Sequence, residues 1–241
     1  MTRTKTILLT RPKAQSLELA NSLKATLPDA VKCLISPLMD IQPTGALPDV
    51  SSFQALLFTS MNGVETFIKM GGQTDLTCFC VGDRTAIAAR ALGLKARSAA
   101  GNVQSLISLI CDTSDPNHGA LLHIRGEHTT GDVIAKLTAR GFAIREAVLY
   151  RQNPVPLTPQ ARAAFLSGEI DALPLFSPRT ARLLAAELHE NPTWPRAHIT
   201  ALCLSENITQ ELPELGAVKI AKTPSRDEMH RLIVQFCTKS G

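Results

Sequence analysis

The feature that most limits how this chain can fold is a strand–turn–helix unit that occurs twice. In the first copy, an apolar run at residues 55–58 predicts a buried strand, Thr59 and Ser60 stand at the turn, and apolar residues at helical spacing follow. The second copy begins at Leu175, and Ser177 takes the place of Ser60. Serine commonly caps helices, and a helix that starts at such a turn directs free N–H groups towards a bound anion. The chain therefore predicts two turns that can hold anions.

The repeat extends beyond these two turns. Arg11 recurs as Arg125, 114 positions later, and Gly82 corresponds to Ser205, 123 positions later. Five segments recur in the same order, which predicts an α/β fold with two similar lobes. Ligands of open α/β sheets bind at the carboxyl ends of the strands, so we expect the binding site in a cleft between the lobes.

Strands and helices alternate along almost the whole chain, as is typical of parallel sheets with helices on both faces. Prolines and a glycine without periodicity predict a loop at residues 40–52, and three prolines predict a linker at residues 151–159. The expected strands are residues 7–10, 31–35, 55–58, 76–81, 95–97, 121–126, 144–150, 172–175, 199–204 and 218–221.

Length and composition exclude several classes of protein. The chain has 241 residues, which favours two domains of about 120 residues each. The net charge is +4 with scattered basic residues and only 4% aromatic residues, whereas nucleic-acid surfaces normally concentrate both, so we expect no nucleic-acid partner. No apolar run approaches the about 18 residues of a spanning helix, and no signal-peptide pattern is present. The six cysteines fall mostly in expected strands and helices, which favours reduced thiols in the cytoplasm.

Motifs for metals and cofactors are missing. Cys78 and Cys80 lie in an expected strand, and no second pair of ligands stands at zinc spacing. The chain also lacks Gly-x-Gly-x-x-Gly, a P-loop and Gly-x-Ser-x-Gly. We therefore expect neither a metal site nor a cofactor.

Several short motifs together resemble the uroporphyrinogen-III synthase family over nearly the whole chain. The most specific motif is Phe58-Thr59-Ser60 followed by Asn62-Gly63-Val64. The other matching motifs are Thr10-Arg11-Pro12, Val81-Gly82 with Thr85-Ala86, Gly93, Val148-Leu149-Tyr150, Ser177-Pro178 and Ala221-Lys222-Thr223-Pro224.

The resemblance implies a discontinuous domain of residues 1–37 with 153–241, and a second α/β domain of residues 38–152. Two crossings of the chain would form a two-stranded hinge between the lobes. Pro37 and the prolines of residues 151–159 fall at these crossings. With no coiled-coil heptads in the chain, we expect a monomer.

The implied reaction is the cyclisation of hydroxymethylbilane, a linear tetrapyrrole, to uroporphyrinogen III in haem biosynthesis. Water is lost and ring D is inverted, without a cofactor. The substrate carries eight carboxylates and closes unaided to the uninverted isomer, so the enzyme, a lyase, mainly has to fix geometry. The resemblance also implies hydroxymethylbilane synthase as a transient partner, and no membrane.

The resemblance assigns roles to individual residues. Tyr150 is the only tyrosine and would donate a proton to the departing hydroxyl; the alternative is a tyrosine that packs at the hinge. The expected substrate-binding residues are Arg11, Thr59, Ser60, Asn62, Gly82, Thr85, Ser177, Arg179, Ser205 and Lys222. The alternatives are solvated surface charge for Arg11, Arg179 and Lys222 and plain helix caps for the hydroxyl residues.

The chain departs from the family pattern at two turns. Phe176 stands where a threonine is usual, which removes one hydroxyl contact, and Asn207 and Ile208 stand where some members carry paired threonines. We expect backbone contacts at the second of these turns. The alternative function is a non-enzymatic two-lobed protein of the same fold that binds a carboxylate ligand or has a regulatory role.

Overall fold

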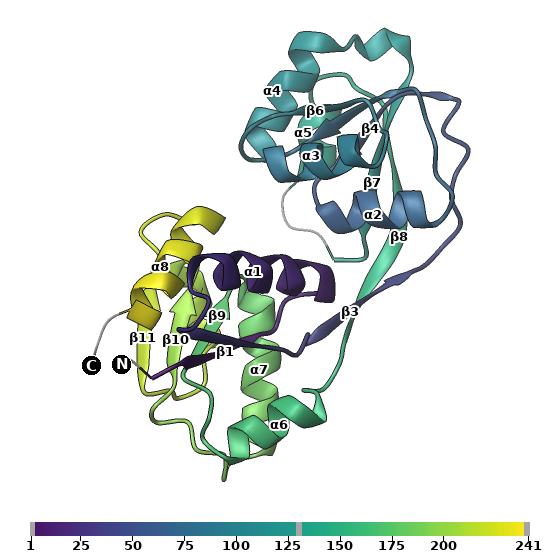
Figure 1. Cartoon of the computed structure of the whole chain (residues 1–241). Helices are drawn as coiled ribbons and strands as arrows, with labels where there is room; N and C mark the ends of the chain where they lie inside the picture. The colour runs from purple at the N-terminus through teal and green to yellow at the C-terminus, as the bar shows by residue number, and fades with distance from the viewer. Residues whose placement is uncertain (1–2, 129–131, 239–241) are drawn as a thin grey trace. The chain divides into compact units, whose positions relative to one another are not determined.

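The computed structural model describes residues 3–128 and 132–238, and it divides the chain into two units (Figure 1). Unit 1 consists of Met1–Asp40 and Asn153–Gly241, and unit 2 consists of Ile41–Gln152. The chain passes from one unit to the other within β3 (Met39–Pro43) and again within β8 (Ile144–Pro154). Each unit is built around a sheet of its own.

The sheet of unit 1 has five strands in the order β11-β10-β9-β1-β2, and neighbouring strands are parallel. Successive side chains of β1 point to opposite faces, so Leu8 joins one apolar cluster while Ile7 and Leu9 join another. The strands are β1 (Lys5–Leu9), β2 (Val31–Ile35), β9 (Ala172–Leu175), β10 (Thr200–Cys203) and β11 (Ala217–Ile220).

Two pairs of helices cover these faces (Figure 1). The face of Leu9 is covered by α1 (Lys13–Thr26) and α8 (Arg226–Thr238), and the face of Leu8 by α6 (Pro159–Leu166) and α7 (Pro178–Glu190). A six-residue 3₁₀ helix, η2 (Glu206–Glu211), follows β10. Apolar side chains on both faces thus bury the inner strands of this sheet, whereas the edge strand β11 is exposed.

The sheet of unit 2 has six strands in the order β3-β8-β7-β4-β5-β6. Its strands, besides β3 and β8, are β4 (Phe53–Phe58), β5 (Thr77–Cys80), β6 (Ala96–Ser98) and β7 (Ala120–Gly126). One face packs against α2 (Met61–Lys69) and α3 (Asp83–Ala91), the other against α4 (Val103–Thr113) and α5 (Val133–Thr138). A short 3₁₀ helix, η1 (Pro116–His118), precedes β7.

The repeated segments occupy matching places in the two sheets. From β11 to β2, unit 1 holds the segments that recur in unit 2 from β6 to β8, in the same spatial order. β3 has no counterpart among the described strands of unit 1 and adds an edge strand beside β8. The prediction of two similar lobes, each with a sheet of mainly parallel strands flanked by helices, is confirmed.

Two stretches predicted as irregular contain strand instead. Residues 39–43 form β3 inside the expected loop, and β8 continues to Pro154 inside the expected linker. An edge strand pairs on one side only, so it tolerates proline and needs no regular apolar alternation. The prediction of a loop at residues 40–52 is therefore wrong for its first part.

Candidate active site

A tyrosine and a serine from distant parts of the chain meet at the carboxyl ends of the strands of unit 2. Ser60 follows β4 at the first position before α2, and its Oγ lies 3.0 Å from Oη of Tyr150 on β8. The backbone of Ser60 is extended, as at a helix N-cap, but within the described part of the chain its side chain makes no capping hydrogen bond. The prediction that Ser60 caps the helix is correct for its position and wrong for its hydroxyl.

Tyr150 is held tightly in place. The residue is 4% exposed and pairs with Gly126 of β7. A Cβ atom built on Gly126 would lie 2.5 Å from the tyrosine ring, so only glycine allows the ring this position. Burial raises the pKa of Tyr150, while hydrogen bonds with Ser60 and the backbone of Gly126 oppose that shift. The phenol is therefore protonated near pH 7 and can act as a donor.

A second hydroxyl contact lies beside the first. Oγ1 of Thr59 is 3.2 Å from Nε2 of His123 on β7. His123 is 3% exposed, and this burial lowers its pKa to about 4, opposed by the charge of Glu146 and assisted by that of Arg125. The imidazole is neutral near pH 7, so one ring nitrogen carries a proton and the other is an acceptor.

Glu146 of β8 links this histidine to the edge of the unit. It pairs in register with His123, and its Oε1 lies 3.9 Å from Nδ1 of the histidine. The same carboxylate forms an ion pair with Arg125, whose second guanidinium nitrogen donates to Oε2 at 3.2 Å. The Glu146 side chain is 31% exposed, so the row Thr59, His123, Glu146 and Arg125 runs from the turn to the solvent.

The other residues expected to bind substrate in unit 2 lie at the starts of α2 and α3. Asn62 and Thr85 are buried, 8% and 7% exposed, which turns their side chains away from solvent. Gly82 precedes α3 with an extended backbone, and the atom nearest to a Cβ there would be the Gly101 carbonyl oxygen at 4.0 Å. What this turn presents is therefore its backbone N–H groups rather than a side chain.

Five of the expected residues lie in unit 1. Each follows the carboxyl end of a strand, and in parallel sheets these ends share one edge. Arg11 follows β1, Ser177 and Arg179 follow β9, Ser205 follows β10, and Lys222 follows β11. Lys222 is exposed, and the other four are partly buried. Unit 1 thus has two arginines and one lysine along one edge of its sheet.

The turn after β9 differs from the turn after β4. Oγ of Ser177 accepts a hydrogen bond from the Thr180 backbone N–H at 3.2 Å, so Ser177 is a true helix cap. The guanidinium carbon of Arg11 lies 4.2 Å from the centre of the Phe176 ring. Where a threonine was expected, the aromatic ring therefore supports an arginine through a cation–π contact.

The structure gathers only some of the expected residues. Thr59, Ser60 and Tyr150 meet in unit 2, and the expected residues of unit 1 lie at the edge of a different sheet. Sequence reasoning missed His123 and Glu146, which stand behind Thr59. A histidine inside the apolar run Leu121-Leu122-His123-Ile124 was the available signal, because such a residue needs a polar partner.

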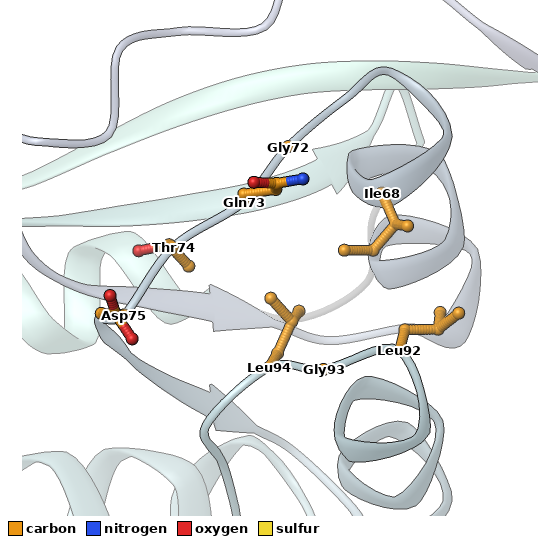
Figure 2. Close-up of a pocket in the computed structure, with 8 residues that line it drawn as sticks. All are labelled: Ile68, Gly72, Gln73, Thr74, Asp75, Leu92, Gly93 and Leu94. Atoms are coloured by element: carbon orange, nitrogen blue, oxygen red, sulfur yellow. The ribbon is translucent and has the colours of Figure 1, made fainter.

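A cavity of about 500 Å³ in unit 2 lies away from this site (Figure 2). Its residues connect the ends of α2 and α3 to the starts of β5 and β6, at the amino ends of the strands. Ile68 and Leu94 point towards one another across it (Figure 2), and Asp75 at its rim forms an ion pair with Lys95 at 2.8 Å. None of the residues expected to bind substrate lines this cavity.

Among residues 3–128 and 132–238, no group of three or more potential ligands is placed to hold a metal ion. Cys78 and Cys80 lie in the apolar core, and burial raises the pKa of each thiol to about 12. The described helices include none with the length and apolar character needed to cross a membrane.

A family model and a curated protein that match this chain belong to the same family. The family model described as "Uroporphyrinogen-III synthase HemD" matches residues 29–233. A curated uroporphyrinogen-III synthase from Chlorobaculum parvum is 24% identical over 193 residues, which cover 74% of this chain and 77% of that protein.

Solved structures show the same fold. A uroporphyrinogen-III synthetase from Helicobacter pylori aligns over 97% of this chain and 100% of its own, with a TM-score of 0.63 and 15% identity. A mutant uroporphyrinogen III synthase from Thermus thermophilus aligns over 97% of both chains, with a TM-score of 0.54 and 16% identity.

Proposed function

Since the chain belongs to the uroporphyrinogen-III synthase family, we propose how its residues divide the work of that reaction. The enzyme is a cyclising lyase of tetrapyrrole biosynthesis, with a linear tetrapyrrole as substrate. Hydroxymethylbilane loses water, ring D is inverted, and the macrocycle closes as uroporphyrinogen III. The observation that carries the proposal is the contact between Ser60 and Tyr150.

Tyr150 is the group that protonates the departing hydroxyl. Its buried phenol keeps its proton near pH 7, and Ser60 fixes the direction of the phenolic oxygen. The carbon–oxygen bond breaks as the proton moves to the leaving oxygen, and water departs. A positioned general acid of this kind typically contributes about 10²–10⁴-fold in rate.

The substrate carboxylates are held by many donors rather than by one residue. In unit 2 these are the backbone N–H groups before α2 and α3, and in unit 1 they are Arg11, Arg179, Lys222, Ser205 and the start of α7. A hydrogen bond to a charged group contributes about 1.5–3 kcal/mol net, and a helix N-terminus about 0.3–1 kcal/mol. Several such contacts fix the folded path of a flexible chain, and that path decides which bond closes.

The domain division that we propose is residues 1–37 with 153–241, and 38–152. The two units and the crossings in β3 and β8 support it. We also propose the cytoplasm as the compartment, supported by six free cysteines, and hydroxymethylbilane synthase as a transient partner.

The isomer of the product tests the function. Freshly made hydroxymethylbilane is incubated with the protein, the product is oxidised, and the isomers are separated by chromatography. We expect mostly type III isomer, while buffer alone gives type I by spontaneous closure. Mostly type I product with the folded protein would contradict the proposal.

A further inference from the structure

The row of polar groups behind Thr59 is absent from the equivalent place in unit 1. The repeat places Phe176 at the position of Thr59 and Leu9 at that of His123. His123 pairs in register with Glu146, and Leu9 pairs in register with Ile35. Phe176, Leu9 and Ile35 all belong to one apolar cluster. The fold is therefore stable with an apolar row at this position, so the polar row in unit 2 needs another reason.

Burial makes the polar side chain of His123 costly to keep in this sheet without a partner. A neutral imidazole in a sheet core loses its contacts with water, and such groups are retained only with a partner. Within residues 3–128 and 132–238, His123 has one hydrogen-bond partner, the Thr59 hydroxyl at 3.2 Å. Its Nδ1 atom is buried, and no hydrogen bond to it is found within the described residues. The contact with Thr59 is thus the main polar interaction of this side chain.

The neighbouring charges decide which ring nitrogen carries the proton. Nδ1 faces the Glu146 carboxylate at 3.9 Å, and this negative charge, which outweighs the opposing charge of Arg125, favours an N–H there over a lone pair. Nε2 is then the acceptor, and the Thr59 hydroxyl must donate its hydrogen to it. The lone pairs of the threonine oxygen remain for a second partner, and Thr59 is partly exposed at the turn. Thr59 is accordingly prepared to accept a hydrogen bond, not to donate one.

We propose that His123 is a positioning residue that orients the Thr59 hydroxyl so that its oxygen accepts a pyrrole N–H of the linear tetrapyrrole. This inference rests on the proposed function and deepens it. The substrate offers two kinds of polar group, carboxylates that only accept and pyrrole N–H groups that only donate. An acceptor oxygen repels the first and binds the second. Adjacent residues of one turn then have different tasks: Ser60 directs the acid, and Thr59 holds a ring.

A double-mutant cycle tests the link between the two residues. Thr59→Val removes the hydroxyl and keeps the shape, and His123→Leu removes the acceptor nitrogen. We expect each single variant to lower kcat/KM by about tenfold, the value of one neutral hydrogen bond. If His123 acts through Thr59, the double variant is no worse than Thr59→Val alone. Independent effects would multiply to about a hundredfold and overturn the proposal.

Two further measurements separate positioning from a purely structural role. His123→Gln can place an amide oxygen near Nε2 and should recover most of the activity that His123→Leu loses. The ratio of type III to type I isomer should fall in Thr59→Val and His123→Leu, since a loosely held ring closes without inversion. Urea unfolding of each variant identifies loss of fold, and His123→Met, which also lacks a strong acceptor at this position, replaces His123→Leu in the cycle if His123→Leu does not fold.

The position of the proton on the His123 ring can be tested without substrate. Nitrogen-15 NMR of the histidine side chains should show His123 protonated at Nδ1, with the Nε2 resonance shifted in Thr59→Val. A proton on Nε2 would overturn the proposal even in an active enzyme. Wild-type protein that makes no type III isomer would instead refute the proposed function, and the pyrrole contact with it. The NMR result would still decide whether His123 orients Thr59.

Discussion

At the carboxyl edge of its sheet, each unit starts a helix with a serine, and the two serines have almost the same backbone angles. Ser60 has φ −152° and ψ 148°, and Ser177 has φ −154° and ψ 149°. Ser177 uses its hydroxyl to cap the helix, whereas Ser60 turns its hydroxyl to Tyr150. One local conformation thus supports two uses of a side chain, and the choice depends on which partner the rest of the unit supplies.

The rows behind the two serines differ in the same way. Unit 1 places its apolar row of Leu9, Ile35 and Phe176 there, and a buried carboxylate, Asp171, lies just before β9. That carboxylate accepts the Thr6 backbone N–H at 2.8 Å, which joins two neighbouring strands. Unit 2 has its buried histidine at the carboxyl edge, beside Thr59. We infer that the buried carboxylate Asp171 serves stability in unit 1 and that the buried histidine serves chemistry in unit 2.

Removal of the Tyr150 phenol tests the difference between the two units most directly. Tyr150→Phe keeps the ring and deletes the phenolic oxygen, so we expect kcat to fall by about 10²–10⁴-fold while folding is preserved. Rates at saturating hydroxymethylbilane measure the effect. The matched control is Ser177→Ala in unit 1, which should reduce kcat far less. A Tyr150→Phe enzyme with normal turnover would remove Tyr150 from the mechanism.

The second prediction concerns the space beside Tyr150. Gly126→Ala places a methyl group 2.5 Å from the tyrosine ring, so the ring must move. We expect a loss of about 1–3 kcal/mol in the free energy of unfolding, together with lower activity. The repeat puts Pro12 at this position in unit 1, where a Cβ is already present.

Pro12→Ala is therefore the matched control for Gly126→Ala, because it adds no atom to the turn. Urea unfolding should show a clearly larger loss for Gly126→Ala. Equal losses in the two variants would mean that the close approach of Gly126 to the ring has no special role.

The third prediction uses pH. The pKa of His123 is about 4 in the folded protein, below the ordinary value of 6.5, so between these values the unfolded chain binds more protons at this site. The contribution of neutral His123 to the free energy of unfolding is therefore fully present above pH 6.5, and it is lost as the pH falls towards 4. From pH 7 to pH 5 we expect His123 to contribute a loss of about 2 kcal/mol. Urea unfolding at several pH values measures it.

Replacement of the histidine isolates its share of that pH dependence. His123→Gln should make the unfolding free energy less dependent on pH by the same amount over this range. The other acidic and basic groups remain in both proteins, so their contributions cancel in the difference. Parallel pH profiles for the wild type and the variant would contradict the low pKa.

The smallest expected changes are those of Ser60→Ala and Ser177→Ala, and they should differ because the two hydroxyls have different partners. Ser177→Ala loses a helix cap, which costs about 1 kcal/mol of stability. Ser60→Ala loses no capping hydrogen bond and should change stability by less than about 0.5 kcal/mol, while lowering kcat through its contact with Tyr150. Thermal unfolding and kinetics of both variants test this pairing, and a larger stability loss in Ser60→Ala would refute it.

The sequence predicted the alternation of strands and helices and the two lobes, because apolar periodicity and a repeated order of turns are local signals. It could not reveal the contact of Ser60 with Tyr150, since the residues lie far apart in the chain. The alternative of a plain helix cap therefore fits the backbone of Ser60 but not its hydroxyl, and the substrate-binding role of Ser60 stays a prediction. The same limit applies to β3, whose Asp40 and Pro43 suit a loop until β8 pairs with that stretch.

His123 shows a different limit. Its position in an apolar run was visible, but its partners come from β4 and β8, and only the register of three strands places them together. The role of Tyr150 and of the substrate-binding residues stays a prediction, because contacts with substrate depend on a molecule whose shape no local pattern describes.

The central place of β1 in unit 1 has a consequence for how the protein is made. β1 lies between β2 and β9, so one of its edges can be filled only by a strand that the ribosome adds more than 160 residues later. Ile7, Leu8 and Leu9 are buried in the finished fold. Until β9 emerges, these apolar side chains lack part of their cover and need shielding, for example by chaperones. Residues 39–154 contain all strands of the second sheet, which can close during synthesis. Translation thus imposes an order in which the second unit is finished before the first.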